Sequence, residues 1–186
     1  MKGTFFCVGT GPGDPRLITF LAAQTIRACD RIAVPQSGAK ENAVLKIATE
    51  FIGEKPVLYC DMPMTRDKER LAQAHDASAR QIASYLDEGE NVAFLTLGDP
   101  SVYATPMYLH RRLKSMGYPT RMISGVPSFC AAAAALDVPL CEGGEALHVI
   151  PASYPDMMRA LDSDGTKVLM KSGKSISEVV RQIQER

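Results

Sequence analysis

The sequence has no excess of either charge. It contains 21 lysines and arginines against 21 aspartates and glutamates in 186 residues. Such a balance produces no overall field that would attract nucleic acid or an anionic membrane. The sequence also lacks an apolar stretch near the ~20 residues of a membrane span, and its start lacks the features of a secretory signal. We therefore expect a cytoplasmic protein that binds neither nucleic acid nor membrane.

The chain also lacks the patterns that are typical of metal sites. Its five cysteines are widely spaced and include no CxxC pair, which favours buried reduced thiols. His75, His110 and His148 are far apart and form no HxxxH pair, so each is interpreted as an ordinary neutral histidine. We predict no metal site formed by protein ligands.

Short apolar strands alternate with helical patterns along the chain. A first strand at 3–8 leads through a glycine-rich turn and a helical pattern to a second strand at 31–35. The alternation returns with helices at 72–86 and 106–116 and a buried strand at 91–97. It predicts an α/β fold of two α/β domains with mostly parallel or mixed sheets.

A smaller α/β region follows the break at Gly117–Pro119. Its predicted strands lie at 121–123, 146–151 and 167–171, and its predicted helices lie at 128–136, 155–161 and 175–185. We divide the chain into an N-terminal domain of residues 1–120 and a C-terminal domain of residues 121–186. A domain as small as the second is hard to stabilise alone. We expect it to be incomplete, or to lean on its neighbour or on a partner.

Two glycine-containing turns follow predicted strands. The first turn is Gly9-Thr10-Gly11-Pro12-Gly13-Asp14-Pro15, and the second turn is Thr96-Leu97-Gly98-Asp99-Pro100-Ser101. Ligands of parallel sheets usually bind at the carboxyl ends of strands, where glycine lets the backbone approach closely. The alternative is structural, because Asp14 and Asp99 can each cap a helix. Two such turns together favour a shared ligand site.

The first turn is not that of a standard dinucleotide-binding fold. Gly13 follows Gly11 by two residues, which breaks the GxGxxG spacing, and Pro12 lacks an amide hydrogen for a pyrophosphate. The next strand ends at Pro35 and Gln36 rather than at an acidic residue. A nicotinamide-dependent oxidoreductase is therefore disfavoured.

Three ordered motifs resemble those of the tetrapyrrole methylase family. The first turn, extended to Thr19, resembles the family's GxGxGDxxLxT signature, and the second turn resembles its GDP segment. A third turn, Ser124-Gly125-Val126-Pro127-Ser128, resembles its PGVTS-type turn. Segments 60–67, 128–133 and 142–145 are similar to the branch that methylates C-20 of precorrin-2 or cobalt-factor II. The resemblance covers the whole chain, although family members usually continue for several more strands.

The resemblance implies a homodimer of two-domain subunits. Each subunit would bind S-adenosyl-L-methionine between its domains and a tetrapyrrole in an adjoining trough. The implied reaction is C-20 methylation on the pathway to cobalamin, with S-adenosyl-L-homocysteine as product. Two alternatives stay open: methylation of another position or substrate within the same family, and a truncated relative without activity.

The family's cofactor contacts carry over onto matching positions of this sequence. These are Pro12, Leu97, Gly98, Asp99, Val102, Pro127, Ser128 and Lys171, the last through its backbone. The third turn departs from the family pattern, since Ser124 replaces the usual proline and Pro127 the usual threonine. Pro127 therefore offers no hydroxyl to the cofactor. A further family contact, a glycine, would lie beyond Arg186.

Methyl transfer from a sulfonium to an electron-rich carbon needs no side-chain nucleophile. Positioning and desolvation are expected to carry the catalysis, and we assign no catalytic residue. Asp14, Asp99 and Tyr103 are candidates for a base by position only. The candidates for substrate contact are Asp14, Arg16, Met64, Arg66 and Tyr103. Arginines suit carboxylates and methionine suits a flat macrocycle, although solvated charge and, for Met62 and Met64, core packing explain these residues as well.

Overall fold

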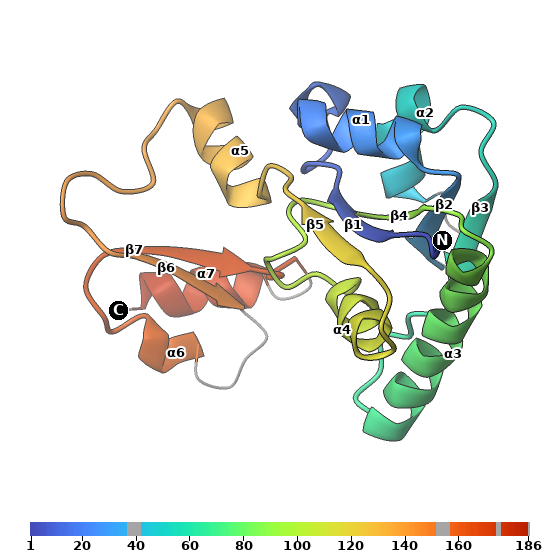
Figure 1. Cartoon of the computed structure of the whole chain (residues 1–186). Coiled ribbons are helices and arrows are strands. Elements are labelled where there is room, and N and C mark those ends of the chain that lie inside the picture. The colour runs from blue at the N-terminus through green and yellow to red at the C-terminus, as the bar shows by residue number, and fades with distance from the viewer. Residues whose placement is uncertain (37–41, 152–156, 174–175, 186) are drawn as a thin grey trace. The chain divides into compact units, whose positions relative to one another are not determined.

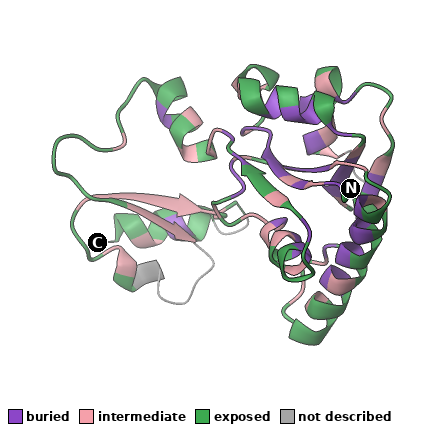
Figure 2. Cartoon of the chain, viewed as in Figure 1, coloured by how far each residue is buried: buried purple, intermediate pink, exposed green. Residues whose placement is uncertain are grey.

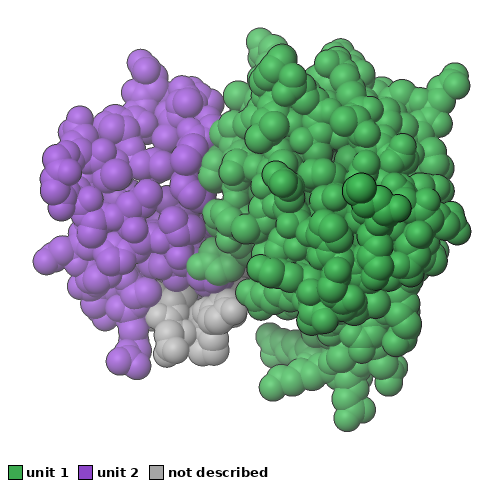
Figure 3. Space-filling model, viewed as in Figure 1, with its two compact units in different colours: residues 1–128 green, residues 129–186 purple. Residues whose placement is uncertain are grey.

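A computed structural model describes residues 1–36, 42–151, 157–173 and 176–185. The chain divides into two compact units, residues 1–128 and 129–186 (Figure 3). Each unit alternates strands with helices and contains a parallel sheet. The predicted α/β fold with parallel sheets is confirmed.

The first unit is built around a five-stranded parallel sheet (Figure 1). Its strands are β1 (Phe5–Gly9), β2 (Arg31–Pro35), β3 (Val57–Cys60), β4 (Val92–Thr96) and β5 (Thr120–Ile123). They follow the spatial order β3-β2-β4-β1-β5. The chain therefore moves outward from β1 in one direction and returns through β4 to β5 on the other side.

Helices cover both faces of this sheet. They are α1 (Phe20–Ala28), α2 (Ala43–Ile52), α3 (Lys68–Asp87) and α4 (Met107–Ser115), with a short 3-10 helix η1 (Pro15–Leu17). Helices α1 and α2 pack on one face, and α3 and α4 on the other (Figure 1). In the parts of the chain that are described, none of the helices has the length and apolarity that a bilayer crossing requires.

Side-chain hydrogen bonds define where these helices begin. The side chains of Thr19, Asn42 and Asp67 accept hydrogen bonds from backbone amides in the first turns of α1, α2 and α3. Such caps satisfy amide groups that have no partner within the helix. Helix α2 ends at Gly53, whose φ of 62° favours glycine.

Alternating side chains of the strands divide the core into two layers. In β4, Val92 and Phe94 face α3 and α4, whereas Ala93 and Leu95 face α1 and α2, and all four are 0% exposed. Phe5 meets Phe94 edge to face, with ring centroids 6.4 Å apart. Figure 2 shows this burial concentrated in the sheet and the inner helix faces. Burial on both faces fixes the register, because a shift of one residue would exchange the layers.

The second unit has a two-stranded parallel sheet. Its elements are α5 (Ser128–Leu136), β6 (Leu147–Pro151), α6 (Met157–Ala160), β7 (Thr166–Met170) and α7 (Ile176–Gln184). All residues of β7 are only partly buried. Within described residues 129–151, 157–173 and 176–185, the buried apolar side chains are Ala133 and Val179.

The division after Ser128 differs from the boundary placed after residue 120 from the sequence. The difference concerns β5, which pairs in parallel with β1, with Val8 opposite Ile123. Strand β5 therefore completes the first sheet. A four-residue strand that follows the helix-breaking segment Gly117–Pro119 gives no indication in the sequence of which sheet it joins.

Candidate functional site

The three turns meet at the carboxyl edge of the first sheet. They follow β1, β4 and β5, which are adjacent strands and end in register, with Gly9 opposite Thr96 and Val8 opposite Ile123. Helices α1 and α4, which follow β1 and β4, leave toward opposite faces of the sheet (Figure 1). Open parallel sheets usually bind ligands at such a place.

Backbone hydrogen bonds join the first turn to the second. The Gly98 amide donates to the Gly11 carbonyl at 2.8 Å, and the Gly11 amide donates to the Gly98 carbonyl at 3.3 Å. The amide and hydroxyl of Thr10 both donate to the Thr96 carbonyl, at 2.9 and 3.0 Å. Gly11 and Gly98 have φ values of 73° and 69°, a left-handed conformation that favours glycine.

The first and third turns touch through two glycines. A Cβ atom on Gly125 would lie 2.1 Å from the Gly98 carbonyl oxygen and 2.8 Å from the Gly9 Cα. A Cβ atom on Gly9 would lie 2.6 Å from the same oxygen and 2.7 Å from the Gly125 nitrogen. Neither position accommodates a side chain. Both glycines belong to the sequence motifs, but this packing role was not predicted.

Asp99 joins the second turn to the third. It is 9% exposed, and its Oδ1 accepts hydrogen bonds from the Ser101 amide at 2.8 Å and from the Ser101 hydroxyl. Its Oδ2 accepts from the Gly125 amide at 2.9 Å. The carboxylate thus shapes its own turn and holds the next one.

The side of this junction away from the sheet is open. Ideal Cβ atoms on Gly13 and Gly98 would have no other atom within 4 Å. Leu97 and Tyr103 are 49% and 45% exposed despite their large apolar surfaces. The junction therefore offers accessible backbone beside apolar side chains, which suits a ligand with a flat apolar part.

The other predicted cofactor contacts in the first unit also lie in or beside these turns. Pro12, Val102 and Pro127 are partly buried, and the Val102 amide donates to the Asp99 carbonyl at 3.3 Å. Ser128 is exposed and begins α5. The structure therefore gathers every predicted cofactor contact except Lys171 at one edge of one sheet.

Lys171 lies in the second unit, directly after β7. Its φ is 62°, and the other described non-glycine residues with positive φ are Tyr103 and Asp137. A left-handed backbone costs such residues ~1–2 kcal/mol and is often found at functional sites. Two of these strained positions belong to the predicted site.

Asp14 and Arg16 pair with each other. The Arg16 guanidinium lies 2.6 Å from Asp14 Oδ2, and the Arg16 amide donates to Asp14 Oδ1 at 2.9 Å. The side-chain hydrogen bond from Arg16 lowers the pKa of Asp14, which makes it a weaker base than an ordinary aspartate. Asp14 also caps η1, so the structural alternative holds at this position. The Arg16 side chain is 89% exposed.

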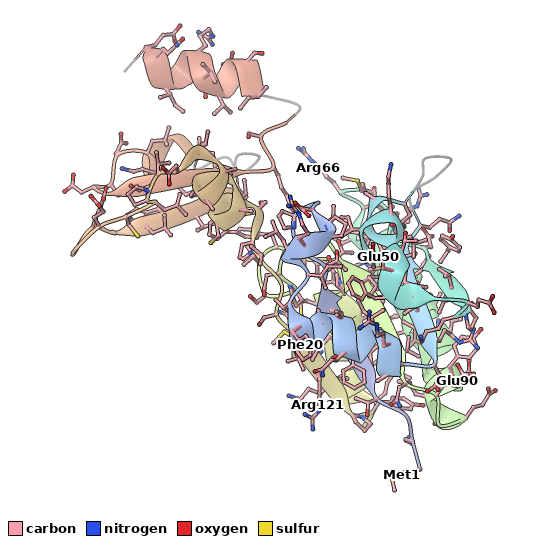
Figure 4. The ribbon with its side chains drawn as sticks, turned by 90° about the horizontal axis from the view of Figure 1, so that it is seen from above. Met1, Phe20, Glu50, Arg66, Glu90 and Arg121 are labelled. Atoms are coloured by element: carbon pink, nitrogen blue, oxygen red, sulfur yellow. The ribbon has the colours of Figure 1, made fainter. Side chains whose placement is uncertain are left out.

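Met64 and Arg66 lie in the loop between β3 and α3. Met64 is 101% exposed, whereas Met62 is 8% exposed and packs in the core. Core packing therefore explains Met62 but not Met64. Arg66 is exposed and lies at the opposite end of the first unit from Met1 (Figure 4). With β2 between β3 and β4, this loop starts about 10 Å across the sheet from the second turn.

The histidines have ordinary surroundings. His75 is 5% exposed and stacks on Tyr108 with ring centroids 4.8 Å apart, and burial lowers its pKa. Burial likewise lowers the pKa of His110, and His148 lies 2.9 Å from the Asp164 carbonyl oxygen. Among the residues that the structure describes, no three histidine, cysteine or acidic side chains are grouped to hold a metal ion.

The cysteines fall into two groups. Cys7, Cys29 and Cys60 are buried, as predicted, and burial raises the pKa of each to about 12. Cys130 and Cys141 are exposed. The prediction of buried thiols is wrong for these two, because the second unit buries little of its surface.

Comparison with known proteins identifies the class of this chain. It belongs to the Tetrapyrrole (Corrin/Porphyrin) Methylases, whose sequence profile matches residues 4–186. The family predicted from the three motifs is therefore confirmed.

Several curated relatives of this chain are named as C(20)-methyltransferases. The "Probable cobalt-precorrin-2 C(20)-methyltransferase" of Methanocaldococcus jannaschii is 33% identical over 180 residues, which cover 96% of this chain and 76% of that protein. The Salmonella typhimurium cobalt-precorrin-2 C(20)-methyltransferase is 32% identical, over 92% of this chain and 73% of that protein. The Sinorhizobium precorrin-2 C(20)-methyltransferase is 30% identical, over 96% and 77%. This chain thus spans about three quarters of these relatives.

Solved structures support the fold. A cobalt precorrin-4 methyltransferase superposes with a TM-score of 0.72 at 21% identity, over 98% of this chain and 74% of that one. A uroporphyrin III C-methyl transferase from Thermus thermophilus gives a TM-score of 0.70 at 19% identity, over 98% and 76%. At these identities the likeness concerns the fold alone.

Proposed function

We propose that this protein transfers a methyl group from S-adenosyl-L-methionine to C-20 of precorrin-2 or its cobalt-containing equivalent, in cobalamin biosynthesis. The relatives named for C-20 methylation support this choice, since they are 30–33% identical over 92–96% of the chain. A precorrin-4 C(11)-methyltransferase is 26% identical over 93% of the chain. A uroporphyrinogen-III C-methyltransferase is 32% identical, but over 74% of the chain. The observation that carries the cofactor part of the proposal is the open junction of three glycine turns, whereas the position of methylation rests on the relatives.

The junction fits the adenosyl part of the cofactor. Gly98 leaves open space where a side chain would project, so a ligand can approach the backbone closely. The exposed Leu97 lies next to it and can shield an adenine ring from water. The residues that would hold the cofactor are Pro12, Leu97, Gly98, Val102, Pro127 and Ser128, with Asp99 shaping the turns from within. Lys171, which lies in the second unit, stays a prediction from the family resemblance.

The cofactor, when bound, supplies a methyl group already activated by its sulfonium. The protein's own task is therefore to orient the ligands and exclude water. Asp99 is committed to hydrogen bonds with Ser101 and Gly125, and the pKa of Asp14 is lowered by Arg16. Both are poor candidates for removing a proton. Tyr103, exposed beside the second turn, is the remaining candidate by position.

The loop between β3 and α3 is our candidate for substrate contact. Arg66 presents a guanidinium, and Met64 presents a fully exposed apolar side chain. A reduced tetrapyrrole has several carboxylates around an apolar ring, which these two groups match. Met62 in the core and Asp67 at the start of α3 anchor the loop at both ends.

Labelled methyl transfer tests the reaction. The protein is incubated with methyl-labelled S-adenosyl-L-methionine and, separately, with metal-free precorrin-2 and its cobalt form. We expect one labelled methyl group per macrocycle, located at C-20 by carbon-13 NMR. Label at another carbon would contradict the C-20 assignment. Lack of both transfer and S-adenosyl-L-homocysteine binding would contradict the proposed function altogether.

Gly98→Ala tests the site itself, with Gly117→Ala as a control. Both glycines have positive φ, at 69° and 84°, and both have open space around an added Cβ. Each substitution should cost ~1 kcal/mol of stability through backbone strain. Calorimetry should show about tenfold weaker S-adenosyl-L-homocysteine binding only for Gly98→Ala, a loss of roughly 1.4 kcal/mol. Equal affinities in the two variants would remove the second turn from the site.

The family's homodimer and cytoplasmic location stay predictions for this chain. Light scattering after size-exclusion chromatography measures the first, and localisation of a tagged chain in cells measures the second.

A further inference from the structure

The peptide unit between Ser124 and Gly125 is held at both ends by side chains from elsewhere in the chain. Its N–H group donates to Asp99 Oδ2 at 2.9 Å, and its carbonyl oxygen accepts from the Thr19 hydroxyl at 3.1 Å. Asp99 belongs to the second turn, and Thr19 caps α1, which follows the first turn. Two distant side chains therefore fix the orientation of one peptide plane in the third turn.

Each of these side chains is itself held by a further bond. The Thr19 hydroxyl accepts from the Ala22 amide at 3.2 Å, so its hydrogen is directed to Ser124. The second oxygen of Asp99 accepts from the Ser101 amide and hydroxyl. A hydroxyl and a carboxylate held in this way have little freedom to choose other partners.

The orientation of this peptide matters because of where Gly125 lies. Its Cα packs against Gly9 and the Gly98 carbonyl, with no room for a Cβ atom. Rotation of the peptide would leave the buried Gly125 amide without a partner, which is unfavourable. It would also change the contact between the third turn and the other two.

We infer that Thr19 and Asp99 are paired positioning residues, which hold the third turn in the shape that receives the methyl donor. Neither touches the reacting atoms; both act through the Ser124–Gly125 peptide. The identity of the ligand rests on the proposed function, whereas the restraint of the peptide does not. From the sequence, Asp99 was predicted to contact the cofactor directly, and Thr19 had no predicted role beyond the motif.

Amide exchange of Gly125 in the ligand-free protein, followed by NMR, tests the restraint directly. Asp99→Ala removes the acceptor, and Thr19→Val removes the hydroxyl at the opposite end. We expect exchange about tenfold faster in Asp99→Ala, and faster than wild type by a smaller factor in Thr19→Val. Thr19→Ser keeps the hydroxyl in place and should restore most of the protection. Asp99→Asn has one acceptor oxygen where the carboxylate uses two, so it should restore only part of it. Unchanged exchange in Asp99→Ala and Thr19→Val would overturn the inference.

Matched controls separate the restraint from general destabilisation. Thr25→Val removes a hydroxyl from the same helix, where it donates to the Leu21 carbonyl. Asp67→Ala removes a helix cap of α3 that makes no bond to the third turn. Both should lower the melting temperature without changing Gly125 exchange. If they accelerate it as strongly as Asp99→Ala does, the effect is global and the inference fails.

A double-mutant cycle on S-adenosyl-L-homocysteine affinity tests whether the two residues act as a pair. Asp99→Ala and Thr19→Val should each weaken binding, by about tenfold and a few-fold. The double variant should bind about as weakly as Asp99→Ala, because the peptide is already released. Two results would contradict paired positioning. One is a double variant whose loss of affinity equals the product of the two single losses. The other is unchanged affinity in variants whose melting temperature is lowered. If the wild type binds no S-adenosyl-L-homocysteine, the proposed function fails, while the exchange data still decide on the restraint.

Discussion

The two compact units differ in how completely they cover their sheets. In the first unit, four of the five residues of β4 are buried, and helices pack on both faces. In the second, β6 and β7 pair only with each other among the described strands, and no residue of β7 is buried (Figure 2). Parallel sheets normally require cover on both faces. The first unit meets this requirement by itself, so it can hold the three turns rigidly.

The largest contrast is expected in thiol reactivity. Burial raises the pKa of Cys7, Cys29 and Cys60 to about 12, from 9.0. Their thiolate fraction at neutral pH should fall by roughly a thousandfold, while Cys130 and Cys141 are exposed. A disulfide reagent should modify the two second-unit thiols rapidly and the others only on unfolding. The double variant Cys130→Ser, Cys141→Ser should lose the fast phase of modification. A first-unit cysteine that reacts in the fast phase would contradict the expected difference between the units.

The next largest contrast is expected in the unfolding free energy that each unit loses when a core side chain is truncated. Phe94→Ala removes a fully buried ring from the first unit and should cost ~4 kcal/mol of unfolding free energy. Leu169→Ala, in the partly buried β7, should cost only ~1 kcal/mol. Urea unfolding of both variants measures the difference. Equal losses would mean that β7 is buried as deeply as β4.

Adding one methyl group should also change the stability of the two units by different amounts, with a smaller difference. Gly125→Ala places a Cβ atom 2.1 Å from the Gly98 carbonyl oxygen and should destabilise the first unit by ~3 kcal/mol. Gly144→Ala, in the second unit, has open space around the added atom and should change stability by less than ~0.5 kcal/mol. Thermal unfolding monitored by circular dichroism compares them. A Gly125→Ala variant as stable as Gly144→Ala would show that the turns are loosely packed.

The smallest expected effect is at Lys171. Lys171→Gly relieves a left-handed backbone with φ of 62°, partly offset by a more flexible unfolded chain, for a gain of ~0.5 kcal/mol. If its contact to the cofactor is through the backbone, S-adenosyl-L-homocysteine affinity should stay unchanged. Lys167→Gly, inside β7, should destabilise instead. Tenfold weaker binding by Lys171→Gly would assign the contact to the side chain.

The alternation of the sequence predicted much of the fold. The strand at 31–35 and the helix at 128–136 match β2 and α5 to the residue. Helix α2 was not predicted, although Asn42 and Gly53 mark its ends. Strand β3 was also missed, because its four residues are all apolar and show no alternation.

The turns of the site could be predicted, but the bonds between them could not. Glycine and aspartate after apolar strands pointed to the first two turns, and the family resemblance pointed to the third. The hydrogen bonds that the Gly125 amide donates to Asp99 and the Thr19 hydroxyl donates to Ser124 depend on β4, β1 and β5 being neighbours. Strand order is not encoded in local alternation, so these partners are visible only in the folded chain.

The contact between Gly9 and Gly125 also limits how this protein can evolve. Since each glycine occupies the space that the other's Cβ atom would need, mutation cannot widen the gap between their backbones one residue at a time. New ligand preferences must instead arise from side chains on the rim, such as Leu97, Val102 and Pro127. The distance between the two backbones should therefore stay constant among related proteins, whereas the side chains around the junction can vary.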